Sequence, residues 1–251
     1  MLLKRVVGWI TATVLILGGC GAASHPGTAA TSQVTVVPHS ISPAVNFALN
    51  GSSFAFWVYT PSSYAAGAPL PVLLLLHGNG GQGLDMIHVW EDFAEQKGIL
   101  LVAPTLNYNA GAEGMVPQLF PQLFDTFKQS WQFDTHRVYV FGVSAGGYLS
   151  YDAATLLSDR FAAAGVFAAI ITPDYYWIVN HAVRKTPIAI YIGDHDQFFT
   201  LAETRSTRDF LLANGFPVHY TEYVNQDHNY GLISAKVNSD FWSYASQFSL
   251  P

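Results

Sequence analysis

The sequence predicts an α/β protein with a mostly parallel central sheet. From Val34 onward, short segments rich in β-branched and aromatic residues alternate with longer segments that suit helices. The run Val72–Leu76 is continuously apolar, which is typical of a strand covered by helices on both faces of a parallel sheet. Half of the 251 residues are hydrophobic, so the chain can bury one sizeable core. We therefore expect one domain over residues 34–251.

The first residues have the features of an export signal. Lys4 and Arg5 give a positive start, and the apolar run Val6–Leu17 is shorter than the roughly 20 residues that span a membrane. Leu17-Gly18-Gly19-Cys20 resembles the lipobox of bacterial lipoproteins, in which the cysteine becomes the acylated first residue. We expect a signal peptide over residues 1–19, a flexible tether over residues 20–33 and a lipid anchor on Cys20 in the cell envelope. An ordinary signal peptide that releases a soluble protein is the alternative.

Eight segments have the composition of strands, and the first two suit antiparallel pairing. In chain order they are Val34–Val37, Phe54–Tyr59, Val72–His77, Ile99–Ala103, Val138–Phe141, Ala163–Ile170, Ile188–Ile192 and Val218–Tyr223. The segments that suit helices lie between the later strands or after the last one. They are Leu84–Lys97, Pro117–Trp131, Ala145–Leu157, Leu201–Asn214 and Leu232–Phe248, with a shorter helix near Tyr175–Val183.

Composition excludes several classes of protein. The net charge is −6 and no run of Lys or Arg occurs, so the chain is poorly suited to bind nucleic acid. Cys20 is the only cysteine, which excludes an intramolecular disulfide and a zinc site built from cysteines. We therefore expect stability to come from packing, and membrane contact to come from the lipid on Cys20 alone.

The motif Gly142-x-Ser144-x-Gly146 lies between the predicted strand Val138–Phe141 and the predicted helix Ala145–Leu157. A sharp turn from strand to helix holds a serine in a strained conformation, and small residues two positions before and after it avoid clashes with neighbouring backbone. The Ser144 hydroxyl would then face the crevice at the carboxyl end of the strand. A glycine-rich turn without chemistry has the same short motif, but the flanking strand and helix favour a nucleophile.

A serine nucleophile needs a base to take its proton and a carboxylate to orient that base. We predict His228 as the base, because it lies in a turn-like stretch between the last predicted strand and the last predicted helix. Asp196, in the loop after the strand Ile188–Ile192, is the predicted acid, and Asp194 is the alternative. The Asp-His-Asp run of this loop also suggests a metal site, but the sequence offers no matching cluster of further ligands. We therefore expect no metal.

The oxygen that becomes negative when serine attacks a carbonyl needs backbone N–H donors. We expect Ala145 to supply one of them and Asn79 the other, from the glycine-rich run at positions 77–81 after a predicted strand. This run does not fit a phosphate-binding loop, because no Gly-Lys-Ser or Gly-Lys-Thr sequence closes it.

Aromatic residues concentrate in segments that should border the crevice. Their rings suit stacking on an aromatic acid or a sugar, although aromatic side chains more often pack in the core or on the surface. The predicted substrate-binding residues are Tyr148, Tyr175, Trp177, Phe198 and Tyr230.

The chain resembles the α/β-hydrolase superfamily over about residues 54–248. The resemblance rests on Leu75-Leu76-His77-Gly78, Gly142-Val143-Ser144-Ala145-Gly146-Gly147, Gly193-x-x-Asp196 and the late His228. The chain is most similar to secreted esterases of the polyhydroxybutyrate-depolymerase-like and feruloyl-esterase-like kinds. The resemblance implies an α/β-hydrolase fold with a mostly parallel eight-stranded sheet, no metal or organic cofactor, and acylation of Ser144 by an ester. Residues 171–187, between two predicted strands, leave little room for a large lid.

These motifs favour hydrolysis of a carboxylic ester by a serine, with a small-molecule, saccharide or polyester substrate. Two alternatives stay open. A serine peptidase or amidase uses the same three residues, because the serine turn does not distinguish an ester from an amide. A non-catalytic surface lipoprotein that keeps the fold for binding is less favoured, since all three positions are occupied. The sequence leaves the oligomeric state open.

Overall fold

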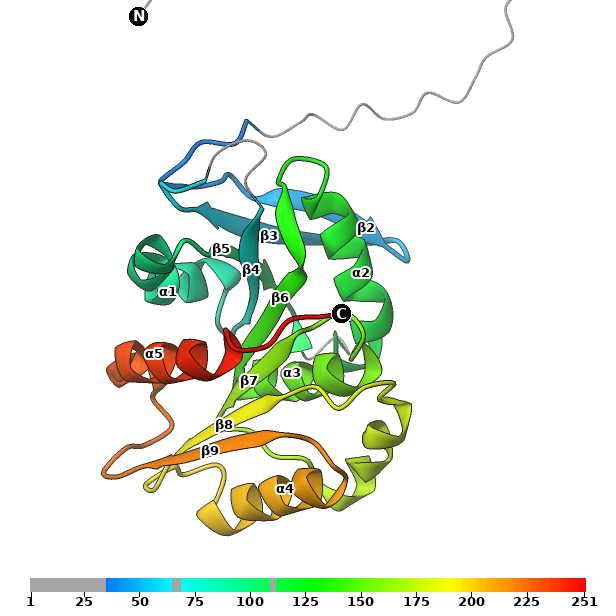
Figure 1. Cartoon of the computed structure of the whole chain (residues 1–251), viewed down its shortest axis with the longest axis vertical. Coiled ribbons are helices and arrows are strands. Elements are labelled where there is room, and N and C mark those ends of the chain that lie inside the picture. Colours follow the sequence, from blue (N-terminus) through cyan, green and yellow to red (C-terminus); the bar gives the residue numbers. More distant parts are fainter. Residues whose placement is uncertain (1–34, 65–68, 109–111) are drawn as a thin grey trace, which may run out of the picture. The chain divides into compact units, whose positions relative to one another are not determined.

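Strands and helices alternate along the chain, as predicted. The computed structural model describes residues 35–64, 69–108 and 112–251, which belong to one compact unit (Figure 1). The predicted signal peptide, the tether and Cys20 lie outside these residues. Among the described residues, no helix is both long and apolar enough to cross a membrane.

Within the described residues, the strands form one nine-stranded sheet in the order β1-β3-β5-β4-β6-β7-β8-β9, with β2 paired to β3. The strands are β1 (Ser40–Ile41), β2 (Val45–Leu49), β3 (Ser52–Thr60), β4 (Leu70–Leu76), β5 (Leu100–Thr105), β6 (Phe133–Val143), β7 (Ala163–Phe167), β8 (Ile188–Gly193) and β9 (Val218–Tyr223). The pairs from β4 to β9 are parallel, whereas β1, β2 and β5 pair with β3 in antiparallel fashion. The predicted α/β-hydrolase fold class is therefore confirmed, but the sheet of the described residues has nine strands where eight were predicted.

Helices cover both faces of this sheet (Figure 1). The α-helices are α1 (Gly83–Lys97), α2 (Val116–Phe127), α3 (Ala145–Leu156), α4 (Leu201–Ala213) and α5 (Ser234–Ala245), and the 3₁₀ helices are η2 (Ala112–Met115), η3 (Pro173–His181) and η4 (Tyr230–Leu232). Side chains of α1 and α5 pack in one core cluster, and those of α2 and α3 pack in the other. The sheet is thus the middle one of three layers.

The strand β4 shows why an unbroken apolar run was informative. Successive side chains of a strand point to opposite faces, so Val72 and Leu74 enter the core cluster under α2 and α3. Leu73 and Leu75, between and after them, enter the cluster under α1 and α5. All four are fully buried, because neither face of the sheet meets water here.

Two features of the N-terminal part differ from expectation. The predicted strand at 34–37 is wrong for residues 35–37, which are irregular, and the first strand is Ser40–Ile41 instead. Pro38 interrupts the Val-rich run and has no N–H to donate to a ladder. The strand β2 was not predicted, although Asn50 and Gly51 mark its hairpin with φ angles of 51° and 81°. This two-residue turn matches the twist of antiparallel strands.

Candidate active site

Ser144 is the single residue between β6 and α3. Its φ is 54° and its ψ is −116°, a conformation that L-residues adopt only under constraint. Two backbone hydrogen bonds supply this constraint: the Ser144 N–H donates to the Phe167 carbonyl at 2.9 Å, and the Gly147 N–H donates to the Ser144 carbonyl at 2.8 Å. The chain therefore turns sharply from the sheet into the helix at this residue.

The glycines of the motif are required by space. A Cβ added to Gly142 would lie 2.1 Å from the Gly146 carbonyl oxygen, and one added to Gly146 would lie 2.4 Å from the Leu76 carbonyl oxygen. Both obstacles are backbone atoms, which cannot rotate away as a flexible side chain does. The turn thus brings α3 against the ends of β4 and β6 at a distance that only glycine permits.

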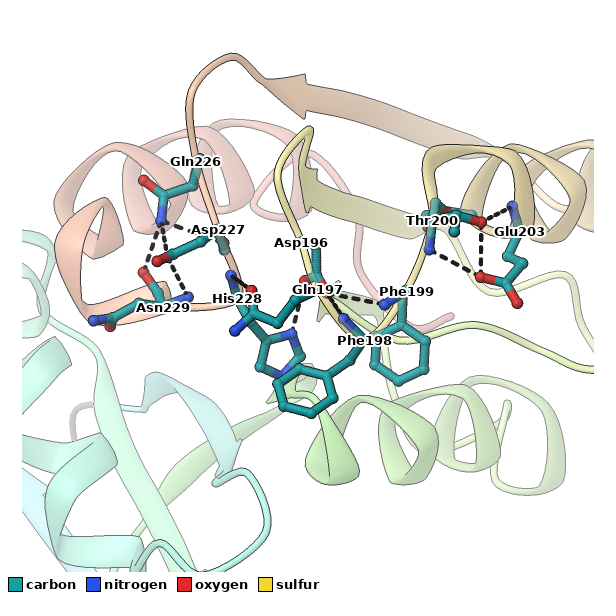
Figure 2. A network of polar contacts seen from close by, with 11 residues as sticks. Asp196, Gln197, Phe198, Phe199, Thr200, Glu203, Gln226, Asp227, His228 and Asn229 are labelled. Carbon is teal, nitrogen blue, oxygen red and sulfur yellow. Dashed lines mark hydrogen bonds and ion pairs between the residues drawn. The ribbon is translucent and has the colours of Figure 1, made fainter.

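Asp196 and His228 face each other between the loops that follow β8 and β9, as Figure 2 shows. His228 Nδ1 lies 2.7 Å from Asp196 Oδ2, and the side chain of Asp196 has no exposed surface. The other oxygen of the carboxylate accepts the backbone N–H groups of Phe198 at 2.8 Å and Phe199 at 2.9 Å. Because a carboxylate only accepts, this geometry places a proton on Nδ1 and leaves Nε2 of a neutral imidazole as the acceptor.

The loop that carries His228 is braced by Gln226, which is 6% exposed. Its side-chain amide donates to the Asn229 carbonyl at 3.0 Å and to Asp227 Oδ1 at 3.1 Å (Figure 2). Asp194 plays a different part from Asp196, since its carboxylate accepts the Gln226 backbone N–H at 3.3 Å. The structure thus brings Asp196, and not Asp194, to the imidazole.

Ser144, His228 and Asn79 line one cavity of about 500 Å³, together with Gly78, Val143, Phe198 and Phe199. Asn79 lies in the loop between β4 and α1, and Ala145 begins α3 directly after the serine. The first N–H groups of a helix have no partner within the helix and carry a partial positive charge. The predicted serine, histidine and Asn79 therefore share one cavity, and Ala145 lies next to it in the chain.

His77 holds the Asn79 loop and was not selected from the sequence. The ring is buried, and its Nε2 accepts the Leu106 N–H at 2.9 Å while its Nδ1 lies 2.6 Å from the Gly78 carbonyl. An accepting Nε2 assigns the proton to Nδ1, which then donates to Gly78. Burial lowers the pKa of His77 and favours this neutral form. The sequence signal that could have identified His77 is a His-Gly pair at the end of a predicted buried strand.

The predicted aromatic residues separate into three groups. Phe198 lies at the mouth of the cavity, with its ring 4.7 Å from that of His228 and 67% of its surface exposed. Tyr148 and Tyr175 line a neighbouring cavity, and Trp177 packs edge-on against Tyr175. Tyr230 corrects the prediction, because it is 6% exposed and packs in the core between other rings, with its hydroxyl donating to Asn238.

Within the part of the chain that the structure describes, no group of three or more His, Cys, Asp or Glu side chains is placed to hold a metal ion. The Asp-His-Asp run is occupied otherwise. Asp194 binds the backbone of Gln226, and Asp196 binds His228 and two backbone N–H groups.

Known proteins share this architecture. The fluorophosphonate-binding serine hydrolase F of Staphylococcus aureus superposes with a TM-score of 0.66 at 16% identity, covering 81% of this chain and 98% of that one. Sheet order, flanking helices and the strained serine turn define the class, which is the α/β-hydrolase fold. The model of the dienelactone hydrolase family matches residues 109–244. The chain belongs to the dienelactone hydrolase family.

Two relatives are similar in sequence. A bifunctional acetylxylan esterase/xylanase of Neocallimastix patriciarum is 32% identical over 151 residues, which cover 55% of this chain and 21% of the relative. A poly(3-hydroxybutyrate) depolymerase of Ralstonia pickettii is 27% identical over 196 residues, which cover 66% of this chain and 38% of the relative. The chain spans less than half the length of either relative.

Proposed function

We propose that the protein hydrolyses carboxylic esters, with Ser144 as nucleophile, His228 as general base and Asp196 as the carboxylate that orients it. The observation that carries the proposal is the 2.7 Å contact between Asp196 and His228, whose imidazole lines the same cavity as Ser144. A serine after β6, a buried carboxylate after β8 and an imidazole after β9 are the groups that acyl transfer needs. The similar acetylxylan esterase and depolymerase support an ester as the substrate.

The proposed reaction rests on the residues that line the cavity and on the contact between His228 and Asp196. His228 Nε2 takes the Ser144 hydroxyl proton as Oγ bonds to the ester carbonyl carbon, and the Asp196 carboxylate stabilises the imidazolium that forms. The N–H groups of Ala145 and Asn79 receive the negative carbonyl oxygen. The C–O bond then breaks, and the alcohol leaves with the proton from His228. Water, deprotonated by the same imidazole, attacks the acyl-enzyme and releases the acid and free Ser144.

The active-site cavity suits a substrate that binds at an open surface rather than one enclosed by a large lid. Phe198 is exposed at the cavity mouth, and between β7 and β8 the chain forms the short helix η3. The substrate classes that fit the site and the two relatives are small-molecule, saccharide and polyester esters.

Labelling with a fluorophosphonate tests the nucleophile, because this probe bonds covalently to an activated serine. We expect wild-type protein to be labelled and Ser144→Ala to be unlabelled, with Ser243→Ala, an exposed serine of α5, as the matched control that keeps the label. Equal labelling of wild type and Ser144→Ala contradicts the assignment. A panel of acetyl, feruloyl and hydroxybutyryl esters beside aminoacyl amides tests the class, and faster amide cleavage contradicts an esterase.

We also propose that the protein is exported and anchored by a lipid on Cys20, as the sequence of residues 1–20 indicates. Metabolic labelling with palmitate should mark the wild type and not Cys20→Ser, and only the wild type should sediment with membranes. A Cys20→Ser protein that still partitions with membranes contradicts the anchor.

A further inference from the structure

A second cavity lies beside the active-site cavity. It has a volume of about 330 Å³ and is lined by residues of α3 and by residues at the start of η3: Tyr148, Asp152, Thr172, Asp174 and Tyr175. Tyr148 packs edge-on against Phe199, with 6.2 Å between the ring centroids, and Phe199 lines the cavity of Ser144. The two cavities are therefore neighbours across this aromatic contact. We name the second one the α3–η3 pocket.

The helix α3 sets the spacing between the pocket and the nucleophile. Ser144 caps the helix, and Tyr148 and Asp152 follow at steps of four residues, which places them on roughly one side of the helix. At 1.5 Å per residue they lie about 6 Å and about 12 Å along the axis from Ser144. A molecule held in this pocket therefore reaches the serine hydroxyl if it extends over one or two sugar rings.

Polar groups form the floor and rim of the pocket. The carboxylate of Asp152 is 1% exposed, and its Oδ1 accepts the Tyr175 hydroxyl at 2.8 Å. Asp174 is exposed at the first turn of η3, and Thr172 precedes this helix as its cap. Carboxylates accept hydrogen bonds, and threonine and tyrosine hydroxyls both donate and accept. This combination matches a ligand that carries several neutral hydroxyl groups.

The helix η3 presents aromatic faces beside these polar groups. Tyr176 stacks on Phe210 of α4 with ring centroids 3.6 Å apart, and Ile178 and Val179 are buried. These contacts fix η3, while the indole of Trp177, on the same helix, stays 46% exposed and lies edge-on to Tyr175 at 5.2 Å. Aromatic faces held in place stack on the apolar faces of ring compounds at low conformational cost.

We propose that the α3–η3 pocket binds the saccharide part of an ester whose acyl group lies at Ser144. The inference rests on the proposed esterase function and names its class of substrate, an acylated neutral oligosaccharide. The exposed carboxylate of Asp174 and no Lys or Arg line the pocket, so an anionic alcohol such as a uronate or a phosphorylated sugar is disfavoured. The exposed Trp177 extends the surface beyond the pocket, where a second ring of the saccharide stacks.

Kinetics with two acetyl esters test the pocket. Acetylated xylobiose carries the saccharide, whereas 4-nitrophenyl acetate has the same acyl group and none. In Trp177→Ala, Asp174→Asn and Tyr175→Phe we expect the ratio of kcat/KM for the saccharide ester to that for the nitrophenyl ester to fall about tenfold, mainly through KM. Asp125→Asn, an exposed carboxylate of α2 outside the pocket, is the matched control for Asp174→Asn and should keep the ratio.

Three results overturn the proposal: equal loss on both esters in the pocket variants, no change in the ratio, or faster turnover of acetylcholine than of acetylated xylobiose. The last result assigns the carboxylates and rings to a cationic alcohol instead. Failure of the proposed function is distinguishable, since wild-type protein would then hydrolyse neither acetyl ester.

Binding without turnover gives an independent readout. Titration of Ser144→Ala with acetylated xylobiose, followed by calorimetry, should give a dissociation constant that rises about tenfold when Trp177→Ala is added. Unchanged affinity in the double variant contradicts the pocket, whatever the catalytic outcome.

Discussion

Asp194 and Asp196 stand two positions apart in one loop, yet their carboxylates have different partners. Asp196 is fully buried at its side chain and meets the imidazole of His228, whereas Asp194 accepts a backbone N–H of the neighbouring loop. The first arrangement orients the proposed base, and the second joins two loops. Sequence position alone does not separate them, because the distinction depends on which carboxylate lies beneath the imidazole after the loops fold.

Substituting the two aspartates separates their roles. Asp196→Asn removes the negative charge that stabilises the imidazolium and favours the wrong tautomer of His228, so kcat should fall by about three to four orders of magnitude. Asp194→Asn should lower kcat by less than about tenfold, since the Gln226 N–H still meets an oxygen. Steady-state kinetics on 4-nitrophenyl acetate measure both. A larger loss in Asp194→Asn than in Asp196→Asn contradicts the assignment of the acid.

At the scale of elements, the turn between β6 and α3 depends on close backbone contacts. In Gly146→Ala the new methyl group meets the Leu76 carbonyl oxygen at 2.4 Å, and neither β4 nor α3 can move without disturbing the core. We expect the free energy of unfolding to fall by about 1–3 kcal/mol and the activity to be lost. Urea denaturation and fluorophosphonate labelling measure the two effects.

Gly114→Ala is the matched control for this prediction. A Cβ at Gly114 meets no atom within 4 Å, and the residue lies in η2. The free energy of unfolding of the Gly114→Ala protein should stay within about 0.5 kcal/mol of the wild-type value, as for other open surface positions. A Gly146→Ala protein as stable and active as Gly114→Ala would show that the turn has more room than the structure gives it.

The sequence predicted an element well where the residues that specify it are neighbours in the chain. The strand β4, the turn at Ser144 and α3 are specified by adjacent residues, and their predicted bounds differ little from those observed. The strand β2 was missed, because its five residues alternate weakly and its only strong signal is the Asn50-Gly51 turn. The helix predicted near Tyr175–Val183 is a 3₁₀ helix over Pro173–His181. Side-chain packing decides between an α-helix and a 3₁₀ helix here, and the periodicity of the sequence does not.

The site shows the same division. The chain order of serine, aspartate and histidine is readable from motifs, but the environment of each aromatic ring is not. Tyr230 lies two residues after His228 in the sequence, yet its ring turns into the core against Phe141 and Phe167. The direction in which such a side chain points is decided by the shape of the core that forms around it.

At the scale of the whole molecule, stability should depend on pH through His77. Burial lowers the pKa of His77 in the folded protein below its unfolded value of about 6.5. As pH falls below about 6.5, the unfolded chain takes up a proton that the folded one does not, so the free energy of unfolding decreases toward the folded-state pKa. The slope from this group approaches about 1.4 kcal/mol per pH unit in that window.

Urea denaturation of wild type and His77→Asn between pH 5 and pH 8 measures this dependence. The variant is expected to be less stable at neutral pH, because the Leu106 N–H and the Gly78 carbonyl lose an imidazole partner. Its stability should also fall less steeply from neutral to acidic pH. Parallel curves for the two proteins contradict a neutral, buried His77.

The order of strands has a consequence for how the protein loses activity on heating. Ser144 follows β6 in the interior of the sheet, but Asp196 and His228, the proposed acid and base, follow β8 and β9, and β9 is the last strand at one edge. Edge strands open, and exchange their amide hydrogens, before the centre of a sheet does. Ser144 therefore lies in a region of higher local stability than His228. Inactivation should therefore precede melting: turnover would disappear while the ellipticity of the central strands persists, and amide exchange should be faster in β9 than in β6. On cooling, β9 should pair with β8 again and turnover should return, so the inactivation should be reversible local unfolding of the edge strand.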